Sequence, residues 1–432
     1  MVAAPQTFAS AVYVDLEGQL VRTDLMLESA LRLIKQSAFN TFLVLWWALH
    51  GKSALASKLA QRVTLDPATL PYDGKLLAWL ATERAAGREL WLRSGANAEL
   101  TKAIAAHLQM FTGILSAAGP DGVHWRTSGG EVAAGPRASA LSRAKALWPA
   151  LRPHQWTKNV LVFVPALAAH RAIDVATDLR AMVAFVAMCL CASSVYILND
   201  LLDLEADRAH PRKCRRPFAS GSASIGAGLA LLPCLLVAGA ALAAWLPQKF
   251  QLALAAYYAL TVGYSFGIKK FLVLDAIALA GLYTLRIIAG AGAAEVALSF
   301  WLLLFSVFLF LSLAFVKRYA ELDTLRRQQR LQALGRGYRV EDLAVLQSFG
   351  CASGYMSVLV LALYINSPAI QSLYHQPKFI WTLCVALLYW ISRVWMFAHR
   401  GSMHDDPVVF ALRDKVSLGI GLLSAVAVAL AV

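Results

Sequence analysis

From about residue 156 onward, long apolar segments alternate with short polar loops, and this pattern constrains the fold more than any other feature. Several segments reach the roughly 20 residues that a helix needs to cross a bilayer. The first is short, so it needs its flanks or a tilt to span. The segments are 160–170, 179–198, 226–246, 251–266, 272–292, 297–316, 347–366, 379–398 and 414–431. We therefore expect a multi-pass α-helical membrane protein with about nine transmembrane helices.

The composition of the 432-residue chain agrees with this pattern. Hydrophobic residues make up 59% and charged residues only 15%, whereas soluble domains carry about 45–50% and about 25%. An ordinary soluble enzyme, a disordered chain and a disulfide scaffold are therefore excluded.

The chain divides into three parts by composition. Residues 1–118 have the character of a small α/β domain. Residues 119–142 are rich in Gly, Pro, Ser and Ala, which is typical of a linker. Residues 143–432 form the predicted transmembrane domain.

The net charge of +14 comes from 40 Lys and Arg against 26 Asp and Glu. Most of the basic loop residues fall on one side of the predicted helices. Basic loops stay cytoplasmic, so we expect a multi-pass protein of the inner (plasma) membrane with a cytoplasmic N-terminal domain and cytoplasmic active-site loops. This distribution favours contact with membrane lipids and no binding of nucleic acid. The sequence leaves open whether the chain forms a homo-oligomer.

An acidic stretch, NDLLDLEAD, runs off the cytoplasmic end of the second segment at residues 199–207. Its spacing of three and four residues places Asn199, Asp200, Asp203 and Asp207 on one helix face. Clustered carboxylates need a cation, and hard oxygen ligands suit Mg²⁺, with Mn²⁺ as an alternative. The competing interpretation is a solvated polar helix end.

The basic segment RAHPRKCRRP follows directly at residues 208–217. Cations beside a metal-binding carboxylate cluster are suited to hold phosphate oxygens, and a solvated helix end does not explain this juxtaposition. A transporter could share the several spans, but it does not require an acidic face beside a basic loop on one side only.

The acidic stretch resembles the signature of the UbiA superfamily of intramembrane prenyltransferases. Further strings resemble its decaprenyl-phosphate phosphoribosyltransferase branch, in family order across about residues 150–432. They are RPHQWTKNV (152–160), YSFGIK (264–269), LRIIAG (285–290), KRYAEL (317–322) and ALRD (411–414). The resemblance implies Mg²⁺-dependent transfer of 5-phosphoribose from phosphoribosyl diphosphate to a polyprenyl phosphate. The alternative is transfer of an isoprenoid from its diphosphate to an acceptor.

The resemblance also implies roles for particular residues. Asp200 and Asp203 become the principal Mg²⁺ ligands, with Asn199 and Asp207 supporting them. Lys213 and Arg216 become candidates for the sugar-phosphate or diphosphate oxygens. Lys158, at the mouth of the first segment, could contact the lipid phosphate or the diphosphate.

A second group of candidates lies near the later segments. Prenyl-transferring relatives usually carry a second acidic motif after the fourth span, where this chain retains only Asp275. We therefore expect a phosphate-binding corner from Tyr264 and Lys269 in place of a second metal site.

The remaining charged candidates have competing interpretations. A charge inside an apolar segment is costly, so Arg286 serves either substrate phosphate or a structural partner. Lys317 and Arg318 either bind phosphate or anchor the helix end. Asp405, Asp406 and Asp414 are expected to be solvated loop charges; these three belong to no candidate site.

The N-terminal domain resembles haloacid-dehalogenase-like phosphatases. SAVYVDLEGQL (10–20) places Asp15 at the nucleophile position, but Glu17 replaces the second Asp, and ELWLRS (89–94) ends in the phosphate-binding Ser94. The later Lys and acidic metal motif are missing, so we expect a degenerate domain without phosphatase activity. The apolar stretch 39–49 is too short to span and is expected to pack on the core, the membrane or the bundle.

Overall fold

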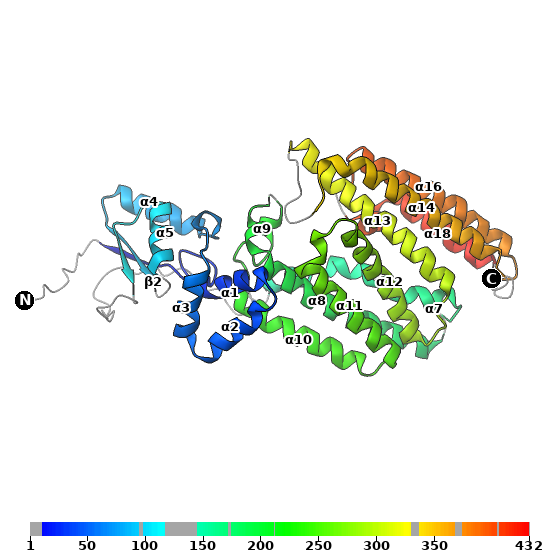
Figure 1. Ribbon diagram of the computed structural model, residues 1–432, viewed down its shortest axis with the longest axis horizontal. Helices are drawn as coiled ribbons and strands as arrows, with labels where there is room; N and C mark the ends of the chain where they lie inside the picture. Colours follow the sequence, from blue (N-terminus) through cyan, green and yellow to red (C-terminus); the bar gives the residue numbers. More distant parts are fainter. Residues whose placement is uncertain are drawn as a thin grey trace, which may run out of the picture. The chain divides into compact units, whose positions relative to one another are not determined.

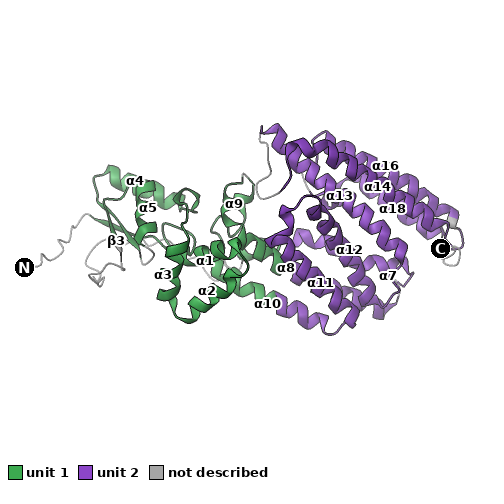
Figure 2. Cartoon of the chain, in the orientation of Figure 1, with its two compact units in different colours: residues 1–152, 193–235 green, residues 153–192, 236–432 purple. Residues whose placement is uncertain are grey.

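The computed structural model forms two compact units (Figure 2). The amino-terminal unit comprises residues 1–152 and 193–235, and the bundle unit comprises residues 153–192 and 236–432. The structure describes residues 11–94, 98–116, 145–171, 174–210, 212–329, 337–367, 374–403 and 406–431. The expected linker at 119–142 lies outside these residues, and the three-part division stays a prediction.

A three-stranded parallel sheet forms the centre of the amino-terminal unit. Its order is β1 (Val12–Asp15), β2 (Leu90–Ser94) and β3 (Gly113–Ser116). Parallel neighbours require long crossover connections, and the helices between the strands supply them. The predicted small α/β region is therefore confirmed.

Helices surround this sheet (Figure 1). Helix α1 begins where the Asp24 carboxylate accepts a hydrogen bond from the Leu27 amide at 2.9 Å, an N-cap that satisfies an otherwise unpaired donor. Leucine and valine side chains from the strands and helices share one buried core. The helices are α1 (Leu25–Gln36), α2 (Asn40–Leu49), α3 (Lys52–Arg62), α4 (Gly74–Ala85) and α5 (Ala98–Leu108).

Helix α2 is the apolar stretch that sequence predicted to be too short to span. It buries Val44 in the core of the unit. Its other apolar side chains are largely exposed, including Phe42 at 72% and Trp46 at 61%. Only one face of this helix therefore packs on the core of its unit.

The second half of the chain is helical, and the multi-pass helical prediction is confirmed. Six helices among the described residues are long and apolar enough to cross a membrane, or seven if the bent pair α17 (Pro407–Arg413) and α18 (Lys415–Ala431) forms one span. The six are α8 (Val175–Leu202), α10 (Ile225–Ala243), α12 (Leu274–Ala294), α13 (Phe300–Arg327), α14 (Leu343–Ile365) with its preceding turn η6 (Val340–Asp342), and α16 (Trp381–His399) with η7 (Pro377–Ile380).

The expected number of about nine exceeds this count for two physical reasons. Segment 160–170 forms no long helix, because a 3₁₀ helix, η3 (Pro153–Phe163), leads into the five-residue α7 (Val164–Ala168). Helix α11 (Gln248–Phe266) has 19 residues, but polar side chains in its first turn and three tyrosines make it less apolar than the six.

Sequential helices pack on one another through the bundle unit, from α11 to α14 and on to α16 and α18 (Figure 1). Helix α12 is the most buried span. A Cβ on Gly290 would lie 2.0 Å from the Val162 carbonyl oxygen, so only glycine permits this approach of η3. Small residues at such contacts are how membrane helices bring backbones together.

Candidate functional site

The acidic stretch lies where α8 passes into the short helix α9 (Leu204–Arg208). Asp203 separates the two helices, yet its amide donates to the Asn199 carbonyl at 2.9 Å, and the Asp207 amide donates to the Asp203 carbonyl at 2.8 Å. These hydrogen bonds join residues four apart, so helical geometry continues from α8 through Asp203 into α9. The predicted one-sided arrangement of the acidic residues therefore rests on a nearly continuous helix.

Asp200 is the most enclosed of these residues, with 2% of its surface exposed. Its Oδ1 accepts hydrogen bonds from Arg152 and, at 3.1 Å, from Arg216. Its Oδ2 is buried and has no hydrogen-bond partner among the described residues. A buried carboxylate oxygen left without a donor is costly, so this atom is suited to accept a ligand.

Arg216 joins two of the predicted acidic residues. Its Nη1 also donates to Asp207 Oδ2 at 2.5 Å, and Asp207 is itself buried. Lys213 begins the short 3₁₀ turn η4 (Lys213–Arg215) and is exposed. Arg216 thus contacts two of the carboxylates, and the exposed Lys213 lies on the same loop.

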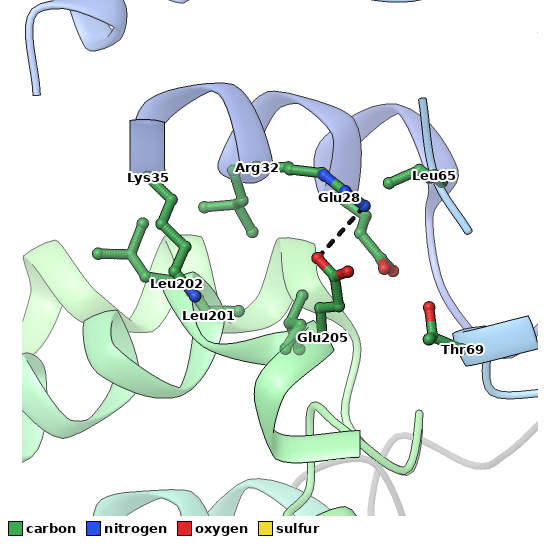
Figure 3. A pocket seen from close by; sticks show the side chains of 10 residues that line it. Glu28, Arg32, Lys35, Leu65, Thr69, Leu201, Leu202 and Glu205 are labelled. Atoms are coloured by element: carbon green, nitrogen blue, oxygen red, sulfur yellow. Dashed lines mark ion pairs between the residues drawn. The ribbon is translucent and has the colours of Figure 1, made fainter. Parts of the chain in front are cut away.

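Asp203 has a partner that sequence reasoning missed. Lys35 of α1 lies 3.0 Å from its Oδ1. One turn earlier on α1, Arg32 pairs with Glu205 at 3.3 Å (Figure 3). Both pairs lie within the amino-terminal unit, beside a small pocket that α1 and α9 line together.

The donor set suits Mg²⁺ in its chemistry. Three carboxylates and the Asn199 amide offer hard oxygen atoms, and Asp200 Oδ2 is available. In the described part of the chain, however, no three acidic, His or Cys side chains gather around one point. Each carboxylate instead contacts a basic side chain, so a metal ion can bind only if those side chains move away from the carboxylates.

In the bundle unit, Asp406 brings two predicted phosphate-binding residues together. Its Oδ2 accepts from Lys158 Nζ at 2.8 Å and from Lys317 Nζ at 2.9 Å, and its Oδ1 accepts from the Tyr283 hydroxyl at 3.2 Å. We name Lys158, Lys317, Asp406 and Tyr283 the two-lysine cluster. With two ammonium groups on one carboxylate, it retains a positive charge.

The expectation that Asp406 is a solvated loop charge is therefore wrong. Packing against η3 and α13 encloses its side chain, which is 10% exposed. The same expectation is wrong for Asp414, whose two carboxylate oxygens both accept hydrogen bonds from Arg393. Asp405 lies outside the described residues.

The two-lysine cluster shifts the acidity of its members. Burial and the neighbouring charge of Lys317 lower the pKa of Lys158 to about 8, although Asp406 partly opposes this. Burial alone would raise the pKa of Asp406, but the charges of Lys317 and Lys158 outweigh it and hold that pKa well below its usual range. Lys158 therefore loses its charge as the pH rises through about 8.

Arg286 is buried within α12 and has several polar partners. It donates to the Asn159 amide oxygen at 2.8 Å, the Leu282 carbonyl at 2.6 Å and the Tyr257 hydroxyl at 3.0 Å. Its guanidinium also lies over the rings of Tyr257 and Tyr283. These contacts account for its burial and favour the structural interpretation.

Arg318 contacts both Asp275 and Tyr264. Arg318 is 1% exposed and lies 2.6 Å from Asp275 Oδ2, while its other nitrogens donate to Glu321 at 2.7 Å and to Tyr264 at 2.8 Å. Tyr338 donates to Asp275 Oδ1. We call Arg318, Asp275, Tyr264, Glu321 and Tyr338 the Arg318 network. Within this network, the Tyr264 hydroxyl accepts a hydrogen bond from Arg318, so these two predicted phosphate-binding residues bind one another.

Lys269 lies in the turn η5 (Ile268–Lys270), where its side chain is partly exposed. The expected phosphate-binding corner of Tyr264 and Lys269 stays a prediction.

Asp15, the residue at the nucleophile position of the phosphatase-like domain, forms an ion pair with a neighbouring strand. Both Asp15 carboxylate oxygens accept from Arg93, at 2.6 and 2.8 Å. The register places these residues side by side on β1 and β2. The position expected for a nucleophile is thus occupied by an ion pair.

Sequence reasoning missed Arg152, Asp406 and Lys35 as members of these clusters. Arg152 begins the string RPHQWTKNV, but the sequence assigned it no role. Its guanidinium also lies over the Tyr196 ring. Lys35 and Asp406 offered no local signal, because each is far in sequence from its partner.

Comparison with known proteins supplies the relatives of this chain. Residues 160–416 match the UbiA prenyltransferase family. The uncharacterized protein y4nM of Sinorhizobium fredii is 33% identical over 96% of this chain and 90% of its own length. Nodulation protein NoeC of Azorhizobium caulinodans is 38% identical over 62% of this chain and 87% of its own.

A third relative matches a smaller part of this chain. Decaprenyl-phosphate phosphoribosyltransferase of Mycolicibacterium smegmatis is 41% identical over 45% of this chain and 61% of its own length. This match covers less than two thirds of that protein.

Among solved structures, a UbiA homolog from Archaeoglobus fulgidus bound to DMAPP and Mg²⁺ matches with a TM-score of 0.50. The identity is 16%, over 66% of this chain and 97% of that one, so this likeness concerns the fold alone. The family match and the full-length relative lead to one conclusion: the chain is a multi-pass membrane transferase that belongs to the UbiA prenyltransferase family.

Proposed function

We propose that this protein transfers 5-phosphoribose from phosphoribosyl diphosphate to a polyprenyl phosphate of the decaprenyl type and releases diphosphate. A lipid phosphate oxygen attacks the anomeric carbon of the ribose. The bond from that carbon to the diphosphate oxygen breaks, and diphosphate departs with the electron pair.

The observation that carries this choice is the state of Asp275. Prenyl-transferring relatives usually place a second acidic motif in this region, whereas here the one carboxylate is enclosed by Arg318 and Tyr338. A second acidic motif would supply paired carboxylates for a second metal ion, and a single carboxylate held in this way does not. The similarity to the Mycolicibacterium phosphoribosyltransferase supports the same choice.

The acidic stretch is the part of the protein that we assign to the diphosphate. Asp200 and Asp203 would hold Mg²⁺, with Asn199 and Asp207 in support. The chemistry that bound Mg²⁺ supplies is neutralisation of the charge that builds on the departing diphosphate. Arg216, freed from one of its two carboxylates, would donate to the same oxygens.

The two-lysine cluster is the part that we assign to a phosphate group. Lys158 and Lys317 both donate to Asp406, so they are held ready without being neutralised in full. A phosphate oxygen would replace one contact of each ammonium group. Asp406 and Tyr283 then position the two cations.

The competing candidate is transfer of an isoprenoid from its diphosphate to an aromatic or other acceptor. Family membership favours it, and the solved UbiA homologs bound DMAPP or GPP with Mg²⁺. Both reactions release diphosphate, so the acidic stretch alone does not separate them.

The test is an assay of the purified full chain in lipid nanodiscs with Mg²⁺. One arm contains ribose-labelled phosphoribosyl diphosphate and decaprenyl phosphate, and the other contains a labelled prenyl diphosphate with an aromatic acceptor. Label entering a lipid-linked pentose phosphate in the first arm supports the proposal. Turnover in the second arm alone would refute it, and Asp200→Asn should abolish either reaction.

A further inference from the structure

One face of helix α1 carries a row of charged side chains that pair with α9 and the residue before it. Glu28, Arg32 and Lys35 are spaced four and three residues apart, which places them on one side of the helix. Their partners follow in reverse order along the chain. The pairs are Glu28–Arg208, Arg32–Glu205 and Lys35–Asp203.

The charges match at every position of this row. Along α1 the signs run negative, positive, positive, and the opposing residues run positive, negative, negative. If α1 slid by one whole pair along the opposing segment, Arg32 would lie opposite Arg208, and two positive charges would meet. The row therefore specifies how α1 meets the acidic stretch. We call these three pairs the α1 ladder.

The Glu28–Arg208 pair is the buried end of the α1 ladder. Both side chains are less than one tenth exposed, and two bonds of 2.6 and 3.0 Å join them. The Thr23 hydroxyl donates to Glu28, and Arg208 Nε donates to the Ala219 carbonyl at 3.0 Å. Arg208 directly follows Asp207, so this pair fixes the end of the acidic stretch.

Close backbone approaches support the same contact. Gly221 has a φ of +71°, and a Cβ there would lie 2.5 Å from Arg22 Cβ. Glycine is therefore required where the loop after the acidic stretch passes the amino-terminal domain. A Cβ on Gly226, at the start of α10, would lie 3.7 Å from the Leu27 side chain, an ordinary contact.

We propose that helix α1 is a positioning element of the transferase site, with opposite roles at its two ends. Glu28 holds Asp207 in place through Arg208. Lys35 occupies Asp203 and competes with the cation that Asp203 would bind. This inference rests on the proposed function, because it takes Asp203 and Asp207 as metal ligands.

The two roles predict effects of opposite sign on metal affinity. Replacing Lys35 removes a competing charge and frees the Asp203 carboxylate, so a divalent cation should bind more tightly. Replacing Glu28 leaves Arg208 buried without its partner and loosens Asp207, so the cation should bind more weakly. A general loss of stability would weaken binding in both variants.

The experiment measures Mn²⁺ binding to the full chain in nanodiscs by electron paramagnetic resonance of the free ion, independently of turnover. We expect Lys35→Gln to tighten binding by about two- to fivefold, the range of a partly exposed ion pair. We expect Glu28→Gln to weaken it by about three- to tenfold. Matched controls are Lys102→Gln and Glu83→Gln, from ion pairs elsewhere in the amino-terminal unit, which should bind Mn²⁺ as the parent does.

Asp203→Asn separates this inference from the proposed function. If Asp203→Asn weakens Mn²⁺ binding while Lys35→Gln leaves it unchanged or weaker, the role of α1 is refuted and the metal assignment stands. If Asp203→Asn leaves Mn²⁺ binding unchanged, the metal assignment fails and the inference fails with it. Thermal unfolding of each variant shows whether weaker Mn²⁺ binding results from loss of the fold. If Glu28→Gln binds Mn²⁺ more weakly only because it unfolds, the inference is also refuted.

Discussion

Arg216 of the basic segment lies 3.1 Å from Asp200 of the acidic stretch, and the same Arg216 nitrogen also contacts Asp207. One guanidinium thus links two carboxylates that are almost fully buried. Without a metal ion, this cation offsets the repulsion between them. With a substrate diphosphate present, Arg216 is a cation already in contact with two of the carboxylates that we assign to the metal.

Replacing Arg216 should therefore impair catalysis more than folding. We expect Arg216→Ala to lower kcat by about 10²–10³-fold, because a donor to the developing charge is lost. Arg216→Lys should retain part of the rate, since it keeps the charge but loses the planar guanidinium and its additional donors. Initial rates in nanodiscs check this, with exposed Arg212→Ala as the control in the same loop. Equal rates for Arg212→Ala and Arg216→Ala would contradict the assignment.

The pKa of Lys158 predicts a pH dependence of substrate binding. A pKa lowered to about 8 means that Lys158 carries its charge below pH 8 and loses it as the pH rises through that value. Phosphate groups stay ionised over this range, so the apparent KM for the phosphorylated substrate should rise about tenfold between pH 7 and pH 9.

Lys158→Arg provides the check on that pH dependence. The arginine charge persists throughout the range, so the KM of this variant should stay flat from pH 7 to pH 9. A parental KM that does not change with pH, or an equal change in the arginine variant, would show that Lys158 does not bind the phosphate.

The Arg318 network should matter for stability and little for the chemical step. Asp275→Asn removes one of the two carboxylates paired with the buried Arg318 and leaves Glu321 as the other, so it should cost about 3 kcal/mol, the lower end for a broken buried ion pair. Tyr338→Phe removes the hydrogen bond to Asp275 and the one that the hydroxyl accepts from the Val273 amide, and should cost about 1–2 kcal/mol. Thermal unfolding in detergent gives the order of the two variants, and kcat of the folded fraction should stay within a few-fold of the parent. A selective loss of kcat in Asp275→Asn without destabilisation would indicate a metal-binding Asp275.

Asp15→Asn tests whether the amino-terminal domain is a phosphatase. Because Arg93 already occupies both carboxylate oxygens, we expect phosphoribosyl transfer to be unchanged. Phosphatase activity towards p-nitrophenyl phosphate should be equally absent from the parent and the variant. Hydrolysis by the parent that disappears in Asp15→Asn would overturn the prediction of a degenerate domain.

The sequence predicted the fold well where the signal is local. Apolar length predicted the long helices, and the strand containing Asp15 followed from its apolar run. The count of spans was too high because hydropathy does not reveal that residues 160–170 comprise the end of a 3₁₀ helix and only a short α7. A polar first turn, as in α11, lowers the apolar character of a helix without shortening it.

The acidic stretch was predicted because its residues repeat at helical spacing within one segment. Asp406 was misassigned because its burial depends on Lys158 and Lys317, which are 248 and 89 residues away. The pairing of Lys35 with Asp203 likewise depends on the docking of α1, which no local pattern encodes. Long-range ion pairs are set by tertiary packing and are beyond the reach of spacing rules.

The most direct test of the central claim is transfer of label from ribose-labelled phosphoribosyl diphosphate to decaprenyl phosphate by the purified chain with Mg²⁺. We predict a lipid-extractable pentose phosphate that forms in proportion to the diphosphate released and disappears in Asp200→Asn. Absence of this product in a preparation that transfers a prenyl group from its diphosphate would contradict the claim.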